Sequence, residues 1–103
     1  MNSALTENQR LLALREQHVP RGIATAHPVV AARAQGAELW DVDNKRFLDF
    51  VGGIGVLNVG HNHPAVVEAV RQQVGKVSHV SFQVAAYETY IDVAARLNAL
   101  IGG

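Results

Sequence analysis

Apolar residues recur at helical spacing near the start of the chain. Thr6 and Gln9 stand three residues apart, the spacing of a capping box, in which two side chains bond the free N–H groups at a helix start. Three leucines follow: Leu11, Leu12 and Leu14. Pro20 ends the pattern, because proline cannot continue a helix. The pattern predicts a helix within residues 1–18.

Two further helical stripes lie within residues 64–101. The first begins at Pro64, a residue favoured at the first helical position, and places His63 at the cap. Its apolar positions are Val66, Val67, Val70, Val74 and Val77. The second ends at Gly102 and Gly103, since glycine commonly follows a helix. Its apolar positions are Tyr87, Tyr90, Ile91, Ala94, Leu97 and Ile101. Each stripe occupies one face, which predicts two amphipathic helices that pack against other surfaces.

The region between these helices reads as extended chain and then a β-hairpin. Residues 19–37 hold two of the three prolines and show no long period, which predicts an extended segment. Residues 38–50 contain two short runs rich in aromatic and branched residues, separated by Asp43 and Asn44, which tolerate the positive φ of a tight turn. Alternation in the second run places Phe47 on one face of this predicted hairpin and Phe50 on the other.

A glycine-rich loop, VGGIGVLNVGHNH, occupies residues 51–63. A dinucleotide-binding fingerprint is disfavoured because Asn58 replaces the third glycine of G-x-G-x-x-G and no helix begins there. Glycine lets the backbone pass close to another surface, and Ile54, Val56 and Leu57 can then line an apolar pocket. A plain buried crossover loop explains the same residues, and the residues alone leave both interpretations open.

Composition and charge argue against several classes of function. The 103 residues include nine basic and nine acidic side chains, whereas nucleic acid or an anionic membrane surface favours a clustered basic excess. The absence of cysteine removes disulfide and thiolate chemistry and fits a reducing, cytoplasmic location. No apolar run approaches the ~20 residues that span a bilayer, and the amphipathic N-terminus lacks a secretory pattern. We therefore expect neither a signal peptide nor a membrane anchor.

The polar residues around the loop offer weak signals of a site. His61 and His63 have a spacing that can hold a metal, but no carboxylate or third histidine lies within several residues. A capping histidine and a turn histidine bonded to backbone are the more typical interpretation. Gln83 lies between Phe82 and Val84, where its amide must find a partner, and a structural hydrogen bond to backbone explains it as well as a pocket does.

Catalysis by these residues alone is not predicted. The serines lack a nucleophile-elbow setting, and no pair of carboxylates falls in the glycine-rich segment. The two lysines, Lys45 in the hairpin turn and Lys76 near a helix end, read as solvated surface positions rather than desolvated amines. The apolar stripes also exceed what this short set of elements can cover. We therefore expect that a partner surface covers these stripes and that the chain folds poorly alone.

Residues 39–73, LWDVDNKRFLDFVGGIGVLNVGHNHPAVVEAVRQQ, resemble the N-terminal signature of the class III (ω-amino acid) pyridoxal-phosphate aminotransferases. That pattern is a hairpin with a D-F end, a G-G-I loop, and G-H-x-H-P opening a helix. Within the family, the flanking segments from residue 19 and around residues 78–90 resemble the members acting on 4-aminobutyrate most closely. Asn44 and Phe47 stand where the pattern more often has Gly and Tyr; Asn accepts a left-handed turn and Phe keeps the ring.

The resemblance implies the fold and the activity of a larger enzyme. The fold class is α/β, with residues 1–103 an α+β N-terminal segment of a fold-type I transferase, truncated from a chain several times longer. The implied activity moves the amino group of 4-aminobutyrate to a 2-oxo acid, with 2-oxoglutarate expected, through pyridoxal 5'-phosphate. Ile54 is then expected to contact the donor's aliphatic chain, and Gln83 to form the polar side of the same pocket.

The resemblance assigns no catalytic, cofactor-binding or metal residue to this segment, because the Schiff-base lysine and the phosphate and carboxylate sites belong to later parts of such chains. It implies a homodimer or homotetramer with small-molecule substrates and no nucleic-acid or membrane partner. Three alternatives stay open: an aminotransferase for another ω-amino acid or for acetylornithine, a truncated non-catalytic interaction module, and a metal-binding module through His61 and His63.

Overall fold

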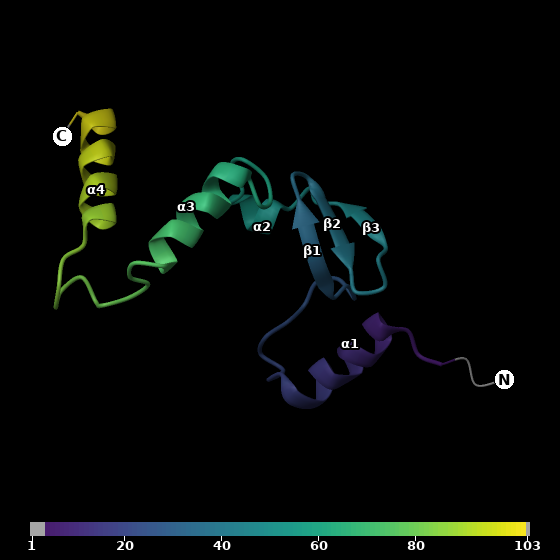
Figure 1. Cartoon of the computed structure of the whole chain (residues 1–103). Helices are drawn as coiled ribbons and strands as arrows, with labels where there is room; N and C mark the ends of the chain where they lie inside the picture. Colours follow the sequence, from purple (N-terminus) through teal and green to yellow (C-terminus); the bar gives the residue numbers. More distant parts are fainter. Residues whose placement is uncertain (1–3, 103) are drawn as a thin grey trace. The chain divides into compact units, whose positions relative to one another are not determined.

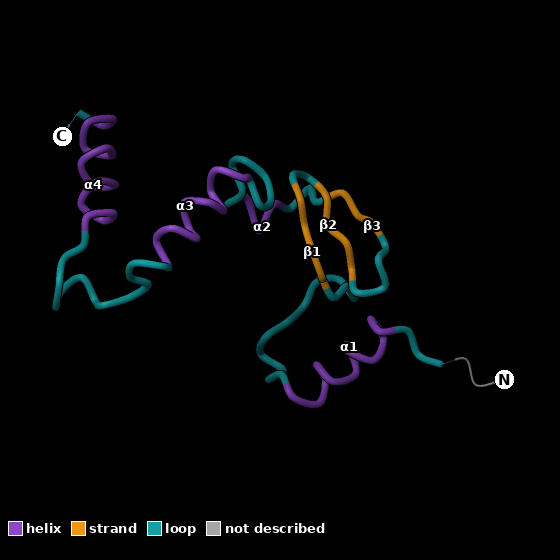
Figure 2. The backbone as a smooth tube through the Cα atoms, viewed as in Figure 1, coloured by secondary structure: helices purple, strands orange, loops and turns teal. Residues whose placement is uncertain are grey.

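The computed structural model describes residues 4–102 and divides after Val67 into two compact units. Figure 1 and Figure 2 show its elements. They are α1 (Glu7–His18), β1 (Ala31–Gln35), β2 (Glu38–Asp41), β3 (Arg46–Leu48), α2 (Gly52–Gly55), α3 (Pro64–Val74) and α4 (Glu88–Ile101). The order of helix, hairpin, glycine-rich segment and two helices is the one that the sequence predicts.

Helix α1 begins with the predicted capping box. The Thr6 hydroxyl accepts a hydrogen bond from the Gln9 N–H at 3.2 Å, and the Gln9 side-chain oxygen accepts one from the Thr6 N–H at 2.9 Å. These two bonds satisfy groups that a helix start otherwise leaves free. The helix ends at His18, and its C-cap, Val19, lies directly before Pro20.

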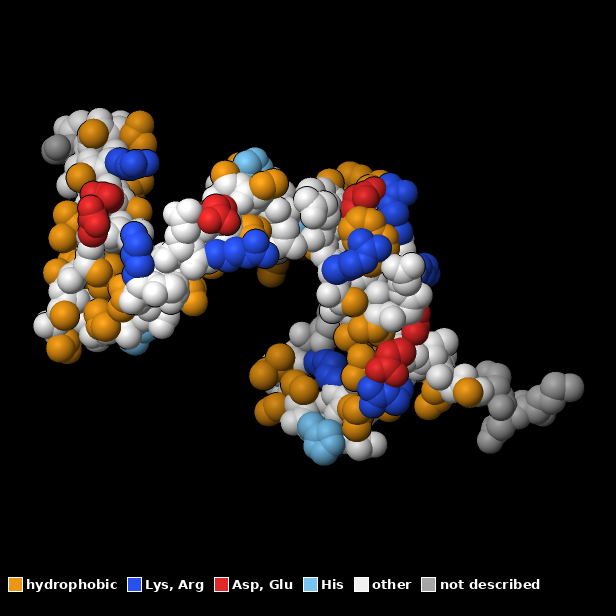
Figure 3. Space-filling view, in the orientation of Figure 1, with side chains coloured by type: hydrophobic (Ala, Val, Ile, Leu, Met, Phe, Trp, Pro, Cys, Tyr) orange, Lys and Arg blue, Asp and Glu red, His pale blue; other side chains and the backbone are white. Residues whose placement is uncertain are grey.

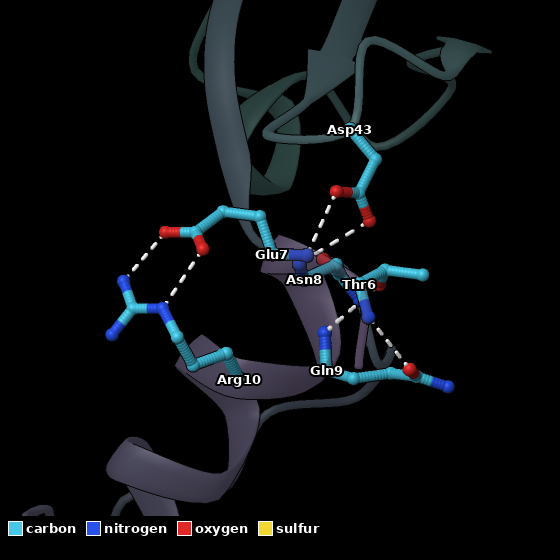
Figure 4. Close-up of polar contacts among 6 residues, drawn as sticks. All are labelled: Thr6, Glu7, Asn8, Gln9, Arg10 and Asp43. Carbon is cyan, nitrogen blue, oxygen red and sulfur yellow. Dashed lines mark hydrogen bonds and ion pairs between the residues drawn. The ribbon is translucent and has the colours of Figure 1, made fainter. Parts of the chain in front are cut away.

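A carboxylate from the β2–β3 turn also binds the N-terminal end of α1. Figure 4 shows the Asp43 carboxylate facing the first turn of α1, where it accepts hydrogen bonds from the N–H groups of Glu7 (3.0 Å) and Asn8 (3.2 Å). A negative charge is favoured there because the helix dipole is positive at its N-terminus. Hydrogen bonds from the Thr6 side chain and from these backbone groups hold the pKa of Asp43 below its ordinary value. The hairpin turn therefore fixes the start of α1.

The sheet has three antiparallel strands in the order β1-β2-β3. The turn joining β2 to β3 uses Asn44 at a positive φ of 63°, as predicted for this hairpin. Strand β1 lies inside the segment predicted only to be extended, and it pairs Ala34 with Leu39 of β2. The guanidinium of Arg33, on β1, lies 3.7 Å from the ring centroid of its cross-strand neighbour Trp40. Strand β1 is thus defined by its partner rather than by its own pattern.

A recognisable cap lies at the start of α3, and another lies at the end of α4. The ring Nδ1 of His63 accepts a hydrogen bond from the N–H of Ala65 at 3.3 Å, so His63 caps α3 as predicted. Helix α4 ends at Gly102, which adopts a left-handed conformation (φ 69°) and donates its N–H to Asn98 O.

In the second unit, Phe82 stacks on Tyr90 with ring centroids 4.2 Å apart, and Tyr87 meets Phe82 edge-on at 5.5 Å.

Within residues 4–102 no hydrophobic side chain is buried, and the single buried residue is Asp41, at 7% exposure. Figure 3 shows hydrophobic side chains at the surface along α4. The exposed ones on α3 and α4 include Val66, Val70, Val74, Leu97, Leu100 and Ile101. The predicted stripes are therefore present and uncovered, except that α3 ends at Val74 and leaves Val77, predicted on its stripe, outside the helix. None of the helices in the described residues combines the length and apolar character needed to cross a bilayer.

Candidate functional site

The glycine-rich segment forms one left-handed helical turn, α2. Gly52, Gly53, Ile54 and Gly55 all have positive φ, at 54°, 63°, 66° and 76°. The turn is closed by a hydrogen bond of 2.8 Å from the Gly55 N–H to Val51 O, and by a second from the next residue to Gly52 O. Left-handed backbone costs an L-residue roughly 1–2 kcal/mol, which glycine avoids because it has no Cβ. Three of the four positions are glycine for this reason.

Ile54 is the exception within the turn. A β-branched residue at φ 66° and ψ 51° is an outlier, because its side chain crowds the backbone in this region. Such a conformation costs of order 1–3 kcal/mol and persists only where surrounding contacts fix it. The Ile54 side chain is 88% exposed, so packing within its own unit does not explain the strain. The turn presents an apolar side chain outward.

Asp49 holds the entry to this turn. One carboxylate oxygen, Oδ1, accepts hydrogen bonds from the N–H groups of Val51 and Gly52, both at 2.9 Å. The other oxygen, Oδ2, lies 2.6 Å from Nε2 of His61. The two side chains are partly buried, with 14% of Asp49 and 21% of His61 exposed. The bond to His61, and then those from Gly52 and Val51, hold the pKa of Asp49 below its ordinary value.

His61 is also fixed through its backbone. Its N–H donates to Gly36 O at 2.8 Å and its carbonyl accepts from the Gly36 N–H at 2.9 Å, which forms a two-residue antiparallel bridge. Gly60, just before it, has φ 76°, and a Cβ there would lie 2.8 Å from Gly36 O. Glycine is therefore required at position 60 by a close backbone approach.

An open hollow of about 370 Å³ lies beside this bridge. It is lined by Gly36, Ala37, Asp49, Gly52, Leu57, Val59, Gly60 and His61. Its polar wall is the Asp49–His61 pair, whose facing atoms already bond each other. The hollow is a gap at the base of the loop. The strained turn starts at its edge, where the Gly52 N–H donates a hydrogen bond to Asp49.

The two residues predicted to contact substrate lie in different units. Ile54 is presented by the left-handed turn of the first unit. Gln83 is exposed in a turn of the second unit that is closed by a 2.8 Å hydrogen bond from the Val84 N–H to Ser81 O. Ser81 itself has a positive φ of 56°. Their roles toward a substrate stay predictions.

The expectation for His61 needs correction. The sequence favoured a turn histidine bonded to backbone, but its ring pairs with the carboxylate of Asp49, twelve residues earlier. The signal that was missed is Asp49 itself: an aspartate that precedes a glycine-rich turn commonly accepts N–H groups two and three residues on. Among residues 4–102 no three His, Cys, Asp or Glu side chains gather as a metal site would require.

Neither lysine in the described residues provides the desolvated amine that pyridoxal phosphate requires. Lys45 and Lys76 are both exposed, and the Lys45 ammonium lies 5.2 Å from the centroid of the Phe47 ring. A Schiff base needs a desolvated amine with a lowered pKa, which an exposed lysine does not provide. We assign no step of cofactor chemistry to residues 4–102.

Comparisons with known proteins agree on one family. The Aminotransferase class-III family model matches residues 20–103. The 5-aminovalerate aminotransferase DavT of Pseudomonas aeruginosa is 50% identical over 96 residues, which cover 93% of this chain and 22% of that protein. The 4-aminobutyrate aminotransferase GabT of Escherichia coli is 46% identical over 99 residues, covering 96% and 23%.

Solved structures give the same answer. The acetylornithine aminotransferase from Elizabethkingia anophelis superposes with a TM-score of 0.84 at 28% identity, covering 92% of this chain and 24% of that one. The chain thus spans about a quarter or less of the relatives it matches. With a family model matching from Pro20 onward and the same fold in a solved relative, the chain belongs to the class-III aminotransferase family.

Proposed function

We propose that this chain is part of a pyridoxal-phosphate enzyme that transfers the amino group of an ω-amino acid to a 2-oxo acid. The donors are 4-aminobutyrate or 5-aminovalerate, and the acceptor is 2-oxoglutarate. The observation that carries the proposal is the family match together with two relatives, at 50% and 46% identity, whose names state these two donors.

Within this enzyme, the segment supplies pocket wall and no reacting group. Ile54 is held outward at 88% exposure, so its apolar surface is free to cover the methylene chain of a donor. Burying a CH₂ group is worth about 0.8 kcal/mol, and an isoleucine leaves no hydrogen-bonding group of the pocket unpaired. Gln83 is exposed in its turn in the second unit, and a role for its amide toward the substrate stays a prediction.

The two donors differ by one methylene, so their relative rates report on this wall. The enzyme containing this chain, loaded with pyridoxal phosphate, should transfer amino groups from one or both donors to 2-oxoglutarate. We expect Ile54→Ala to lower kcat/KM by about tenfold, within the range for losing apolar contact in a substrate pocket. Ile23→Ala is the matched control, because Ile23 is an exposed isoleucine (60%) outside the turn.

Two results would count against the proposal. Absence of transfer from both donors, with good rates on acetylornithine, would favour the alternative suggested by the acetylornithine aminotransferase fold. Absence of any pyridoxal-phosphate absorbance after loading would favour a non-catalytic interaction module. An equal effect of Ile54→Ala and Ile23→Ala would remove Ile54 from the pocket and leave the activity proposal intact.

The exposed apolar stripes of α3 and α4 support an oligomer or a larger chain that covers them. We propose a homodimer or homotetramer, because most soluble oligomers are symmetric assemblies of two or four identical subunits. Light scattering coupled to size-exclusion chromatography measures this directly, and a monomeric active enzyme would exclude it. A cytoplasmic location stays a prediction.

A further inference from the structure

We propose that Asp49 and His61 are positioning residues, which hold the left-handed turn Gly52–Gly55 in place and thereby direct Ile54 at the amino donor. The inference rests on the proposed function for its consequence and on the geometry of the loop for its cause. Neither residue touches the reacting atoms in this scheme. Their effect passes through the turn.

The first argument is that the turn needs external support. An isoleucine in left-handed backbone is unfavourable by itself, and the exposed Ile54 side chain makes no buried contact that would offset the strain. The support comes from Asp49 Oδ1, which accepts the N–H groups of Val51 and Gly52 at the entry to the turn. These two bonds fix the orientation of the peptide units from which the left-handed turn starts.

The second argument is that His61 fixes Asp49 in turn. The 2.6 Å contact between Nε2 of His61 and Oδ2 of Asp49 joins the two ends of the loop. His61 is itself held to the end of β1 by its paired backbone bonds with Gly36. A loop clamped at both ends has fewer conformations available than a free one, so its tip is held in one place. Ile54 lies near the middle of the clamped loop.

The third argument concerns the alternative roles of the pair. The hollow beside it has no further charged side chain in its lining, since the other lining residues are glycine, alanine, leucine and valine. Oδ2 of Asp49 and Nε2 of His61 bond each other, so these two atoms are not available to bind a molecule in that space. Structural clamping of the loop accounts for all three contacts of the carboxylate.

The test compares four variants of the enzyme that contains this chain, each loaded with cofactor. Asp49→Ala removes all three contacts of the carboxylate, and His61→Ala removes only the ring contact. Asp49→Asn keeps an oxygen for Val51 and Gly52, and the double alanine variant completes a mutant cycle. The readouts are KM and kcat for 4-aminobutyrate and 5-aminovalerate separately, and the backbone conformation of Ile54 by crystallography.

We expect Asp49→Ala to change the ratio of kcat/KM between the two donors by about tenfold, because a misplaced contact group weakens substrate positioning. His61→Ala should change it in the same direction, and Asp49→Asn should recover part of the loss. The double variant should differ little from Asp49→Ala, since residues acting through one contact are not additive. Glu7→Gln, which removes an exposed carboxylate and its ion pair with Arg10, is the matched control with an unchanged ratio.

A fall in thermal stability with an unchanged donor ratio would overturn the inference, because it would show a structural role alone. If Asp49→Ala does not fold, His61→Ala and Asp49→Asn still decide the question. If the enzyme transfers no amino group from either donor, the proposed function fails, while the conformation of Ile54 still tests the pair. A left-handed Ile54 retained in both Asp49→Ala and His61→Ala would overturn the positioning role in every case.

Discussion

Replacing Gly60 by alanine is expected to open the bridge at the base of the glycine-rich loop. Gly60 has φ 76°, a conformation that costs an L-residue roughly 1–2 kcal/mol. The new Cβ would also lie 2.8 Å from Gly36 O and 3.0 Å from its C and Cα atoms. All three are backbone atoms, so no side-chain rotation relieves the overlap, and overpacking of this kind costs typically about 1–3 kcal/mol.

Gly55→Ala is the matched control for this prediction. Gly55 has the same φ of 76°, but beyond its chain neighbours and the backbone of its own turn no atom lies within 4 Å of a Cβ built there. The control therefore shares the conformational cost and lacks the overlap. The difference of about 1–3 kcal/mol corresponds to roughly a fivefold to hundredfold difference in the equilibrium for local opening, at about 1.4 kcal/mol for each factor of ten.

Hydrogen–deuterium exchange of the whole protein measures this opening. The N–H groups of Gly36 and His61 bond each other's carbonyls and should be protected in the parent protein. In Gly60→Ala, peptides covering residues 34–37 and 60–62 should exchange roughly fivefold to hundredfold faster than in Gly55→Ala. Equal exchange in the two variants would show that the overlap is relieved without breaking the bridge, and would refute the reasoning.

Three further predictions concern the rest of the chain. Thr6→Ala removes the hydroxyl that accepts the Gln9 N–H, so it should destabilise the start of α1 by about 1 kcal/mol; exchange rates of the α1 amides check this, and unchanged rates would contradict it. The pKa of Asp49 is lowered in the folded state, so its contribution to stability is complete above its ordinary value of 3.8 and is lost as the pH falls further. The Gly52 amide resonance should shift in that acid range, and the shift should vanish in Asp49→Asn. Residues 1–103 alone should show no cooperative thermal transition, because no hydrophobic side chain of residues 4–102 is buried; a cooperative calorimetric peak from a monomer would disprove this.

Local sequence signals predicted the ends of the helices well. The Thr6 and Gln9 box, the His63 cap and the left-handed Gly102 each depend on residues within four positions of one another, so their physics is visible in a short window. The tight turn at Asn44 is of the same kind. Each feature is fixed by the backbone needs of one turn.

Features that depend on distant residues were not predicted. The sequence of β1, AARAQ, has none of the β-branched or aromatic residues that are typical of strands, and it is a strand because β2 offers a partner edge. The pairing of Asp49 with His61 spans twelve residues and requires the intervening loop to turn back. Glycine content indicated a close approach of the backbone in this loop, as Gly60 makes to Gly36, but four consecutive left-handed residues, with Ile54 among them, required the structure.

Aspartate carboxylates account for much of the local order in the first unit. Asp41 Oδ1 accepts the N–H groups of Asp43 and Lys45, Asp43 holds the first turn of α1, and Asp49 holds the entry to α2. Each carboxylate satisfies two backbone donors, so the turns are specified without an apolar core. Such contacts set geometry over a few residues, whereas cooperative stability comes mainly from buried apolar surface. The loop geometry is thus set by local contacts, and because the stripes of α3 and α4 remain exposed, we expect the segment to depend on another surface for its stability. The contacts of Asp49 and His61 can therefore set the conformation of the strained turn that carries Ile54. Covering the helices should then stabilise this turn without changing its conformation.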